Sequence, residues 1–335
     1  MREALVALFL PAAVTAAAIA IALRTRLAER LADRPNERSL HEAPRPRIGG
    51  LAIMLGALPV AAWWGDEAIR TAVACAAALS IVSAADDVRS LPATVRLPAH
   101  FVAAVVVVGA VAGGAGWSAW VDAGVVLAIA WMTNLFNFMD GADGLAGGMA
   151  AIGFGALAWS AGSAAPTLAL ACMALASASL AFLAFNFPPA RVFLGDAGSI
   201  PLGFLAGAFG LEGAVAGVWP PWLPVLVFSP FIVDATLTLA GRAARGEPFW
   251  RAHRSHAYQR LVLAGWSHRR LALHGYALML AAAASALWAA SGGVMLRCGI
   301  IAAWTGAWVL LVLAIERHLR HVGSGLGASR GRSVD

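Results

Sequence analysis

Long apolar runs are the feature of this sequence that most limits what the chain can fold into. Eleven runs approach the roughly 20 residues that an α-helix needs to cross a bilayer. A lipid-exposed backbone must satisfy its own hydrogen bonds, and a helix does so within one continuous segment. We therefore predict an all-α, polytopic membrane protein with about eleven transmembrane helices, at residues 4–23, 48–64, 69–85, 98–116, 119–139, 146–163, 166–187, 199–217, 222–240, 271–290 and 294–315.

The composition agrees with this prediction and excludes several other classes of protein. Of the 335 residues, 60% are hydrophobic and only 13% are charged. A typical soluble domain is roughly 45–50% apolar and about 25% charged. One water-soluble core could not bury this much apolar surface, which excludes an ordinary cytosolic enzyme, a disordered protein and a disulfide-stapled domain. We assign residues 1–322 to one integral membrane domain and residues 323–335 to a flexible cytoplasmic tail.

The basic residues indicate how the chain is oriented in the membrane. All 24 are arginines, and 21 of them lie in the segments 24–47, 86–97, 188–198, 241–270 and the tail after 316. Eleven spans place these segments on one side, which the positive-inside rule makes cytoplasmic. We therefore expect the N-terminus outside and the C-terminus inside. Membrane topology also explains the net charge of +6 without a nucleic-acid partner.

Carboxylates gather at the same predicted cytoplasmic boundary, although they belong to different spans. Asp86 and Asp87 end the third run, and Asp196 lies just before the eighth. Acids at the C-terminal end of a helix oppose the helix dipole. A bound metal ion, or nearby arginines such as Arg96, should therefore compensate Asp86 and Asp87. We expect the acids to converge on one site for a cation and an anionic substrate.

The segment from Asn134 to Leu145 carries the densest polar pattern. Asn134 and Asn137 are three residues apart, so they share one face of a helix. Asp140 and Asp143 follow, each before a glycine that permits a tight turn and close approach to a ligand. Carbonyl and carboxylate oxygens are the hard ligands that Mg²⁺ prefers. A plain helix-terminating turn would need fewer polar groups than this segment contains.

Two later segments add groups that suit phosphate. Residues 195–199 place glycines and Asp196 directly before a span, where backbone N–H groups favour an anion. His253, Arg254 and His256 lie in the large basic loop, and this combination suits recognition of a diphosphate or a sugar. The plainer alternatives are a Gly-rich turn for the first segment and a solvated basic loop for the second. Two histidines alone make a weak transition-metal site.

Together, these segments resemble the polyprenyl-phosphate N-acetylhexosamine-1-phosphate transferases, the MraY/WecA superfamily. The family pattern appears in order: Asp-Asp, Asn-x-x-Asn-x-x-Asp-Gly-x-Asp-Gly-Leu, Phe-x-Gly-Asp-x-Gly-Ser and a late His motif. The first loop, with residues 35–41 and 44–50, also looks familial. The resemblance covers about residues 33 to 262 and implies an MraY-like architecture. The segment 253–259 is most similar to the WbpL-type O-antigen initiating branch and departs from the His-rich motif of the peptidoglycan enzyme.

The resemblance also implies roles for individual residues. Asn137 and Asp196 would hold Mg²⁺, or alternatively Mn²⁺, on the diphosphate. Asp86 or Asp87 would deprotonate or place the lipid phosphate, in one step or through a covalent aspartyl intermediate, and Asp196 completes this catalytic set. The residues implied to bind substrate are Arg96 at a phosphate, Asp143, Gly144 and Phe193 at the uracil, His253, Arg254 and His256 at the sugar phosphate, and Asn134 and Asp140 nearby.

The implied reaction is the first membrane step of O-antigen-type polysaccharide synthesis in a bacterial inner membrane. A UDP-N-acetylhexosamine would give its sugar-1-phosphate to a polyprenyl (undecaprenyl) phosphate and release UMP. UDP-GlcNAc, UDP-FucNAc and UDP-QuiNAc all remain open as donors, and a homodimer is an option by family analogy alone.

Three other classes of function compete with this prediction. One is a relative of the same fold, either a phospho-N-acetylmuramoyl-pentapeptide transferase or a teichoic-type enzyme. Another is a transporter, which should carry charges near the middle of the bilayer. Here the acids cluster at one face, although Asp234 lies within the predicted span 222–240. The third is a non-catalytic membrane scaffold, which would not need the intact set of Asp and Asn residues.

Overall fold

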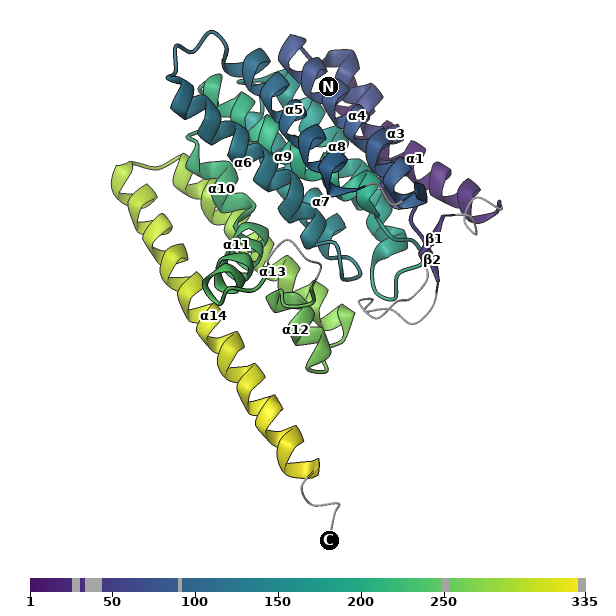
Figure 1. Cartoon of the computed structure of the whole chain (residues 1–335). Helices are drawn as coiled ribbons and strands as arrows, with labels where there is room; N and C mark the ends of the chain where they lie inside the picture. The colour runs from purple at the N-terminus through teal and green to yellow at the C-terminus, as the bar shows by residue number, and fades with distance from the viewer. Residues whose placement is uncertain (26–30, 34–43, 90–91, 249–252, 331–335) are drawn as a thin grey trace.

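The computed structural model describes residues 1–25, 31–33, 44–89, 92–248 and 253–330, with the backbone alone at 88, 89, 93 and 322–330. Its helices are α1 (Arg2–Leu23), α3 (Gly49–Trp64), α4 (Glu67–Arg89), α5 (Ala93–Ala112), α6 (Ala119–Phe138), α7 (Leu145–Ala161), α8 (Pro166–Asn186), α9 (Asp196–Val215), α10 (Trp222–Val227), α11 (Ser229–Ala244), α12 (Ala257–Leu263), α13 (His268–Ala290) and α14 (Val294–Arg330), labelled in Figure 1. Two short strands, β1 (Ala32–Asp33) and β2 (Arg45–Pro46), pair antiparallel.

The helices confirm the predicted class of fold. Within the described ranges, eight helices are long and apolar enough to cross a membrane, namely α1, α4, α5, α6, α8, α9, α13 and α14. The apolar helices α3 and α7 are shorter, with 16 and 17 residues. Every predicted run coincides with a helix or with a pair of helices. The chain is therefore an all-α polytopic membrane protein.

The predicted run at 222–240 is not one continuous helix, so this part of the prediction is wrong. The short helix α10 ends at Val227, and α11 starts at Ser229 after Phe228 leaves the helical conformation. Pro230 explains the restart, because proline has no N–H to donate and its ring clashes with the carbonyl four residues earlier. Figure 1 shows α11 nearly end-on while α6 and α9 run across the view, so α11 departs from the direction of the bundle.

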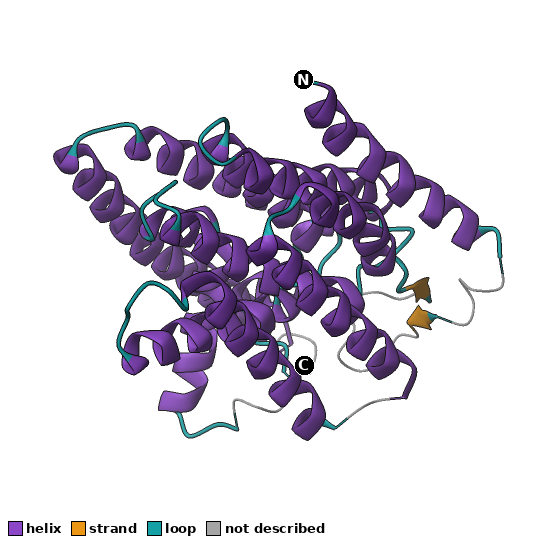
Figure 2. Cartoon of the chain, turned by 90° about the horizontal axis from the view of Figure 1, so that it is seen from above, coloured by secondary structure: helices purple, strands orange, loops and turns teal. Residues whose placement is uncertain are grey.

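The centre of the bundle is formed by α8 and α9, which pack among helices that are distant in sequence. α8 lies against α1, α3 and α7, and α9 lies against α4 and α6. Figure 2 shows the bundle of helices from above. Small residues allow such close packing where lipid supplies no hydrophobic force between helices. At the closest approach of α3 and α9, a Cβ added to Gly50 would lie 2.3 Å from the Cα atom of Gly198.

Main-chain hydrogen bonds join the first basic loop to the segment that precedes α9. The N–H of Phe193 donates to Pro46 at 2.9 Å, and the N–H groups of Gly49 and Gly50 donate back to Phe193 and Leu194 at 3.0 and 2.8 Å. We call this pairing of residues 46–50 with 193–194 the backbone strip. It places the start of α9, and therefore Asp196, relative to α3.

The last helix, α14, lies at the edge of the bundle (Figure 1). None of its most apolar window is buried within the protein, as expected of a helix that faces lipid. The Nε1–H of Trp304 donates to the Ser285 hydroxyl of α13 at 2.7 Å. α14 continues to Arg330, so residues 323–330 of the predicted tail extend this helix. Residues 331–335 lie outside the described part of the chain.

Candidate active site

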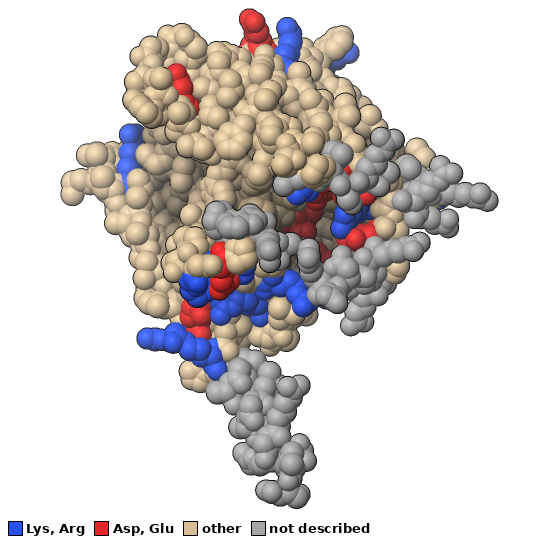
Figure 3. Space-filling model, in the orientation of Figure 1, with Lys and Arg blue, Asp and Glu red and all other residues tan. Residues whose placement is uncertain are grey.

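Polar side chains from separate helices meet at one end of the bundle. Asp86 and Asp87 come from the end of α4, Asn137 from the end of α6, and Asp196 from the start of α9. Asp140 lies in the loop between α6 and α7. We call these five residues the acid cluster. Figure 3 shows a hollow in which acidic and basic side chains lie close together, in the half of the molecule where most charged atoms gather.

Arg96, near the start of α5, connects two parts of the acid cluster. Its Nη1 atom lies 2.5 Å from Oδ2 of Asp86 and 3.5 Å from Oδ2 of Asp196. Asp86 is buried, whereas the Arg96 side chain is 36% exposed. The predicted compensation of the Asp-Asp pair by Arg96 is thus realised for Asp86. A single guanidinium neutralises carboxylates from motifs that are 110 residues apart in sequence.

Arg47 performs the same task for the neighbouring carboxylate. Its Nη1 atom lies 3.2 Å from Oδ1 of Asp87, and its Nη2 atom lies 2.8 Å from Oδ2 of Asp33. Burial lowers the pKa of Arg47, but the charges of Asp33 and Asp87 outweigh this effect and leave that pKa above its usual value. The two consecutive aspartates therefore have different arginine partners.

The amide of Asn137 faces the start of α9. Its Oδ1 atom accepts a hydrogen bond of 2.9 Å from the hydroxyl of Ser199. Asn134, one turn earlier, donates from Nδ2 to the carbonyl of Ala130 at 2.7 Å. The predicted polar face of this helix is present, and Asn137 is the member that reaches α9.

Asp140 is the carboxyl group whose protonation the cluster affects most clearly. Burial raises the pKa of Asp140 well above its usual value, and the nearby carboxylates of Asp196 and Asp87 raise it further. Arg47 and a hydrogen bond from the Gly195 backbone oppose this shift without cancelling it. Carboxylates that are close together cannot all ionise freely, so this site favours a bound cation or a shared proton.

Asp143 and Gly144 form a second polar group beside the acid cluster. The Ala190 N–H donates to Oδ2 of Asp143 at 2.9 Å, and His268 Nδ1 lies 3.3 Å from its Oδ1. Burial raises the pKa of Asp143, but the hydrogen bonds from His268 and Ala190 outweigh burial, so that pKa lies below its usual value. Gly144 adopts φ +77°, and its N–H donates to Asn186 Oδ1 at 2.8 Å. Asp143 is therefore an ionised, rigidly held acceptor.

Phe193 lies in the backbone strip and is partly exposed. The segment 35–41, the other part of the predicted first-loop motif, lies outside the described residues.

Residues 253–256, which we call the His loop, contain side chains of very different exposure. Arg254 is exposed and His253 is partly buried, whereas His256 is only 2% exposed. The Nδ1 atom of His253 lies 2.8 Å from the Ser255 hydroxyl. Burial, together with the charges of His256 and Arg242, lowers the pKa of His253 to about 4. At neutral pH His253 is therefore an uncharged hydrogen-bonding group.

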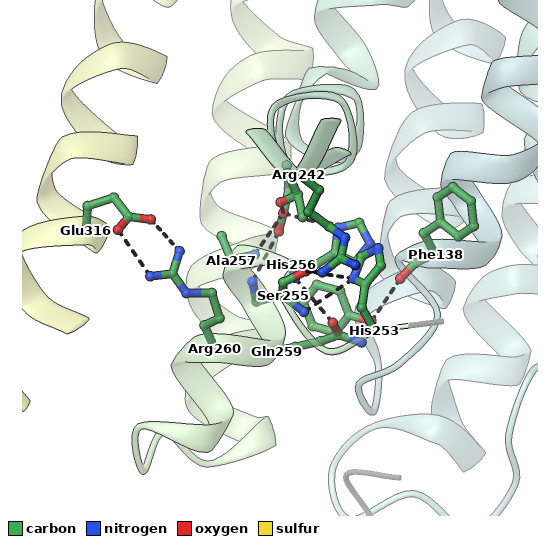
Figure 4. Close-up of polar contacts among 12 residues, drawn as sticks. Phe138, Arg242, His253, Ser255, His256, Ala257, Gln259, Arg260 and Glu316 are labelled. Carbon is green, nitrogen blue, oxygen red and sulfur yellow. Dashed lines mark hydrogen bonds and ion pairs between the residues drawn. The ribbon is translucent and has the colours of Figure 1, made fainter. Parts of the chain in front are cut away.

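The His loop is attached to the segment that carries Asp140. The Tyr258 hydroxyl, just after the loop, donates to the carbonyl of Phe138 at 2.9 Å. The rings of Phe138 and His256 are stacked with centroids 6.0 Å apart. Figure 4 shows His253 and His256 between Arg242 and Phe138. The predicted substrate-binding loop thus lies beside the end of α6, which also supplies Asn137.

An apolar cavity of about 460 Å³ lies behind this contact. It is formed by α11, α12, α13 and α14, and its wall includes Phe231, Trp266, Met279, Trp308 and Ile315. Such a lining suits a hydrocarbon chain better than a nucleotide.

Sequence reasoning missed several side chains that organise the site, and only some left a signal. Arg47 was one of seven arginines in its segment and lies in the familial stretch 44–50, but the sequence indicated no partner for it. Asp234 was visible as an acid within the predicted span 222–240. Tyr258 lies in the familial segment 253–259 but was given no role, and His268 carried no signal, because both roles depend on contacts between distant parts of the chain.

The oxygen atoms of the acid cluster are the candidate ligands for the predicted Mg²⁺. No three His, Cys, Asp or Glu side chains in the described residues form a ready-made metal site. In the part of the chain that the structure describes, Arg47 and Arg96 nevertheless pair with Asp86, Asp87 and Asp196, three of the four carboxylates of the acid cluster. The carboxylate oxygens and the amide oxygen of Asn137 are hard donors, which fit Mg²⁺ rather than a soft transition metal.

These features define a polytopic membrane protein whose carboxylates and arginines form one polar site at the end of a helical bundle. Comparison with known proteins then identifies the family. The model of glycosyl transferase family 4 matches residues 69–214, which include both asparagines and all five predicted aspartates. The chain belongs to this family, the MraY/WecA superfamily.

Relatives that align over most of the chain have related names. A probable undecaprenyl-phosphate N-acetylglucosaminyl 1-phosphate transferase of Bacillus subtilis is 30% identical over 84% of this chain and 81% of its own length. A decaprenyl-phosphate N-acetylglucosaminephosphotransferase of Mycobacterium leprae is 28% identical over 71% of this chain and 72% of its own. A phospho-N-acetylmuramoyl-pentapeptide-transferase of a Nostoc species is 35% identical, over 53% and 48% of the two chains. The family and these names indicate a sugar-1-phosphate transferase.

Proposed function

We propose that the protein transfers an N-acetylhexosamine-1-phosphate from a UDP-sugar to a polyprenyl phosphate and releases UMP. The observation that carries the proposal is the contact of Arg96 with both Asp86 and Asp196. It joins the Asp-Asp motif to the Gly-Asp motif in one site, beside Asn137 and Asp140. A reaction between two phosphorylated substrates needs such an arrangement of positive charge and acids.

The chemistry follows from the charges at this site. An oxygen of the acceptor phosphate attacks the sugar-linked phosphorus of the UDP-sugar, and the bond to the UMP oxygen breaks. One phosphoanhydride replaces another, so the reaction needs no further energy source. Arg47 and Arg96 reduce the repulsion between the two anions. Asp86 or Asp87 accepts the proton when the acceptor phosphate arrives protonated.

Asn137 and Asp196 would hold Mg²⁺. When bound, the ion would neutralise charge on the diphosphate and polarise its phosphorus–oxygen bonds. Asp143, Gly144 and Phe193 would contact the uracil, while His253 and Arg254 would contact the sugar phosphate. In this assignment the deeply buried His256 supports the loop from behind.

The donor to test first is UDP-N-acetylglucosamine. Two relatives that align over most of the chain carry N-acetylglucosamine in their names, whereas the muramoyl-pentapeptide relative named above aligns over about half. We further propose that the protein starts O-antigen-type polysaccharides, as in the WbpL-type branch. It would do so in a bacterial inner membrane with the site on the cytoplasmic side.

The direct test is transfer of radiolabelled sugar-1-phosphate to undecaprenyl phosphate by the purified protein, across a panel of UDP-N-acetyl sugars. Asp87→Ala and Asp196→Ala should abolish transfer and leave expression unchanged. Asp122→Asn, at the opposite end of α6 from Asn137, is the matched control and should retain full activity. Wild-type turnover by either alanine variant would disprove the site assignment.

Two additions to this assay separate the competing functions. EDTA should stop the reaction and Mg²⁺ should restore it, so product formation that resists EDTA would contradict the metal assignment. UDP-N-acetylmuramoyl-pentapeptide should not serve as donor. Uptake of a UDP-sugar into proteoliposomes, without lipid-linked product, would instead indicate a transporter.

A further inference from the structure

Asp234 is a carboxylate in α11 that the proposed reaction does not use. Its side chain is only 12% exposed. Its Oδ1 atom accepts hydrogen bonds from the Ala257 N–H at 2.8 Å and the Thr238 hydroxyl at 3.1 Å, and its Oδ2 atom accepts one from the Tyr258 N–H at 3.1 Å. A buried carboxylate is costly unless such partners satisfy it. The Asp234 carboxylate therefore fixes the backbone of Ala257 and Tyr258, the two residues that follow the His loop.

The same two residues connect the His loop to the acid cluster. The Tyr258 hydroxyl donates to the Phe138 carbonyl, and a Cβ on Gly141 would lie 2.2 Å from the Tyr258 hydroxyl oxygen. Phe138 and Gly141 stand on either side of Asp140 in the chain. Tyr258 therefore contacts the chain both before and after Asp140, at the end of α6 and in the α6–α7 loop.

His256 fills the space between these contacts. Its ring stacks on Phe138 and on Tyr258, with centroids 6.0 Å away in each case. Its Nδ1 atom lies 3.5 Å from Oδ1 of Asp234. Phe138, Tyr258 and Asp234 thus enclose the His256 ring. His253 and Arg254 are the more exposed members of the loop.

We propose that Asp234 and Tyr258 are positioning residues for sugar-phosphate transfer, which hold the His loop at a set distance from the acid cluster. Asp234 holds the end of the loop through two backbone N–H groups, and Tyr258 ties that end to the segment bearing Asp140. Neither side chain needs to touch the substrate. The inference deepens the proposed function and rests on it.

Asp234→Asn keeps the shape of the side chain and replaces one acceptor oxygen with an amide that cannot accept from an N–H group. We expect kcat/KM for the UDP-sugar to fall at least tenfold, with a raised KM for the UDP-sugar and an unchanged KM for undecaprenyl phosphate. Partial misfolding would lower the amount of active protein and leave both KM values unchanged. The rise in one KM therefore separates positioning from a general loss of folding.

Thr238→Val is the matched control, because it removes a hydrogen bond to the same carboxylate and leaves both bonds from the Ala257 and Tyr258 N–H groups in place. Its kcat/KM should stay within twofold of wild type. Tyr258→Phe keeps the ring and removes the hydroxyl that donates to the Phe138 carbonyl, so we expect a loss of about three- to tenfold. Wild-type kinetics in both Asp234→Asn and Tyr258→Phe would overturn the proposal.

A double-mutant cycle tests whether Asp234 acts through the loop. We compare the fold-decrease in kcat/KM that Asp234→Asn causes in the wild type and in a His253→Ala background. In the His253→Ala background this fold-decrease should be less than one third as large, because the group that Asp234 positions is already missing. Equal factors in the two backgrounds would show that Asp234 acts independently of His253 and would overturn the assignment.

Hydrogen exchange tests the contact without any activity measurement. The amides of Ala257 and Tyr258 should exchange at least tenfold faster in purified, full-length Asp234→Asn than in wild type or Thr238→Val. Unchanged exchange would refute the role of Asp234. If wild type transfers no sugar from the panel while this exchange difference appears, the proposed function fails and the structural role of Asp234 stands.

Discussion

Arg96 shows how much one side chain contributes to this site. It holds Asp86 and Asp196 with one end of its guanidinium group. Lysine carries the same charge as a point on a flexible stem, without the planar set of donors. We expect Arg96→Lys to lower kcat/KM about 100-fold, in line with the loss of one transition-state donor. Initial rates of transfer measure this effect.

Arg317→Lys is the control for this experiment, because Arg317 is exposed on α14 and should tolerate the change. Arg96→Lys activity within threefold of wild type would show that the guanidinium geometry is not needed.

Asp143 leads to a prediction about pH. Its pKa is below the usual value in the folded protein, so its ionised form stabilises the fold above the unfolded pKa near 3.8. This contribution is lost as pH falls from about 4 through the lower folded pKa. Asp143→Asn should therefore reduce the melting temperature in detergent at pH 7, by the equivalent of about 1–3 kcal/mol for lost hydrogen bonds to a charged group. The difference in melting temperature between Asp143→Asn and wild type should shrink below pH 4. A difference that stays constant with pH would contradict this prediction.

The sequence was informative about individual residues where a motif placed several polar groups at the end of a helix. Asp86, Asn137 and Asp196 were predicted in this way, and the structure brings them into one site. The pairing of Arg47 with Asp87 could not be predicted, because it depends on how a loop 40 residues away folds back. Asp234 was predictable only in part. Its charge stood out within an apolar run, but the sequence did not indicate its hydrogen-bond partners.

At the scale of helices, the contact of α3 with α9 is sensitive to one methyl group. Gly50→Ala would place a Cβ 2.3 Å from Gly198, and backbone on both sides leaves no flexible side chain to move away. We expect a loss of about 1–3 kcal/mol from overpacking, together with reduced transfer because Asp196 begins α9. Thermal unfolding and initial rates measure the two effects.

Gly109→Ala in α5 is the matched control. No atom lies within 4 Å of a Cβ added there, so the substitution should be neutral or stabilising by up to about 1 kcal/mol. Equal effects of the two substitutions would show that the approach of α3 to α9 does not limit stability.

The helices themselves were largely predictable, since each apolar run that a membrane can accept favours a helix. The break between α10 and α11 was not predicted, because hydropathy averages over the residues that interrupt a helix. Two prolines, Pro224 and Pro230, were the available signal. Hydropathy also did not predict the packing of α8 and α9 at the centre, since α1 and α14 are at least as apolar and lie at the periphery.

At the scale of the whole molecule, the distribution of arginines predicts the orientation in the membrane. A fluorescent protein fused to the C-terminus should fluoresce, because that end is expected in the cytoplasm. Alkaline phosphatase fused at the same point should be inactive. As a control, phosphatase fused after Asp66, between α3 and α4, should be active. An active C-terminal phosphatase fusion would invert the predicted topology.

The backbone strip has a consequence for how this chain can be altered. Its bonds join main-chain atoms of Pro46, Gly49 and Gly50 to those of Phe193 and Leu194. The strength of these hydrogen bonds does not depend on side-chain identity. Their alignment depends on the number of residues in each of the two paired segments. A single alanine inserted after Arg47 would shift the N–H groups of Gly49 and Gly50 past their acceptors while Pro46 stays paired with Phe193. Chimeras with relatives should therefore exchange whole segments of equal length, because one residue too many would displace Asp196 more than most substitutions could.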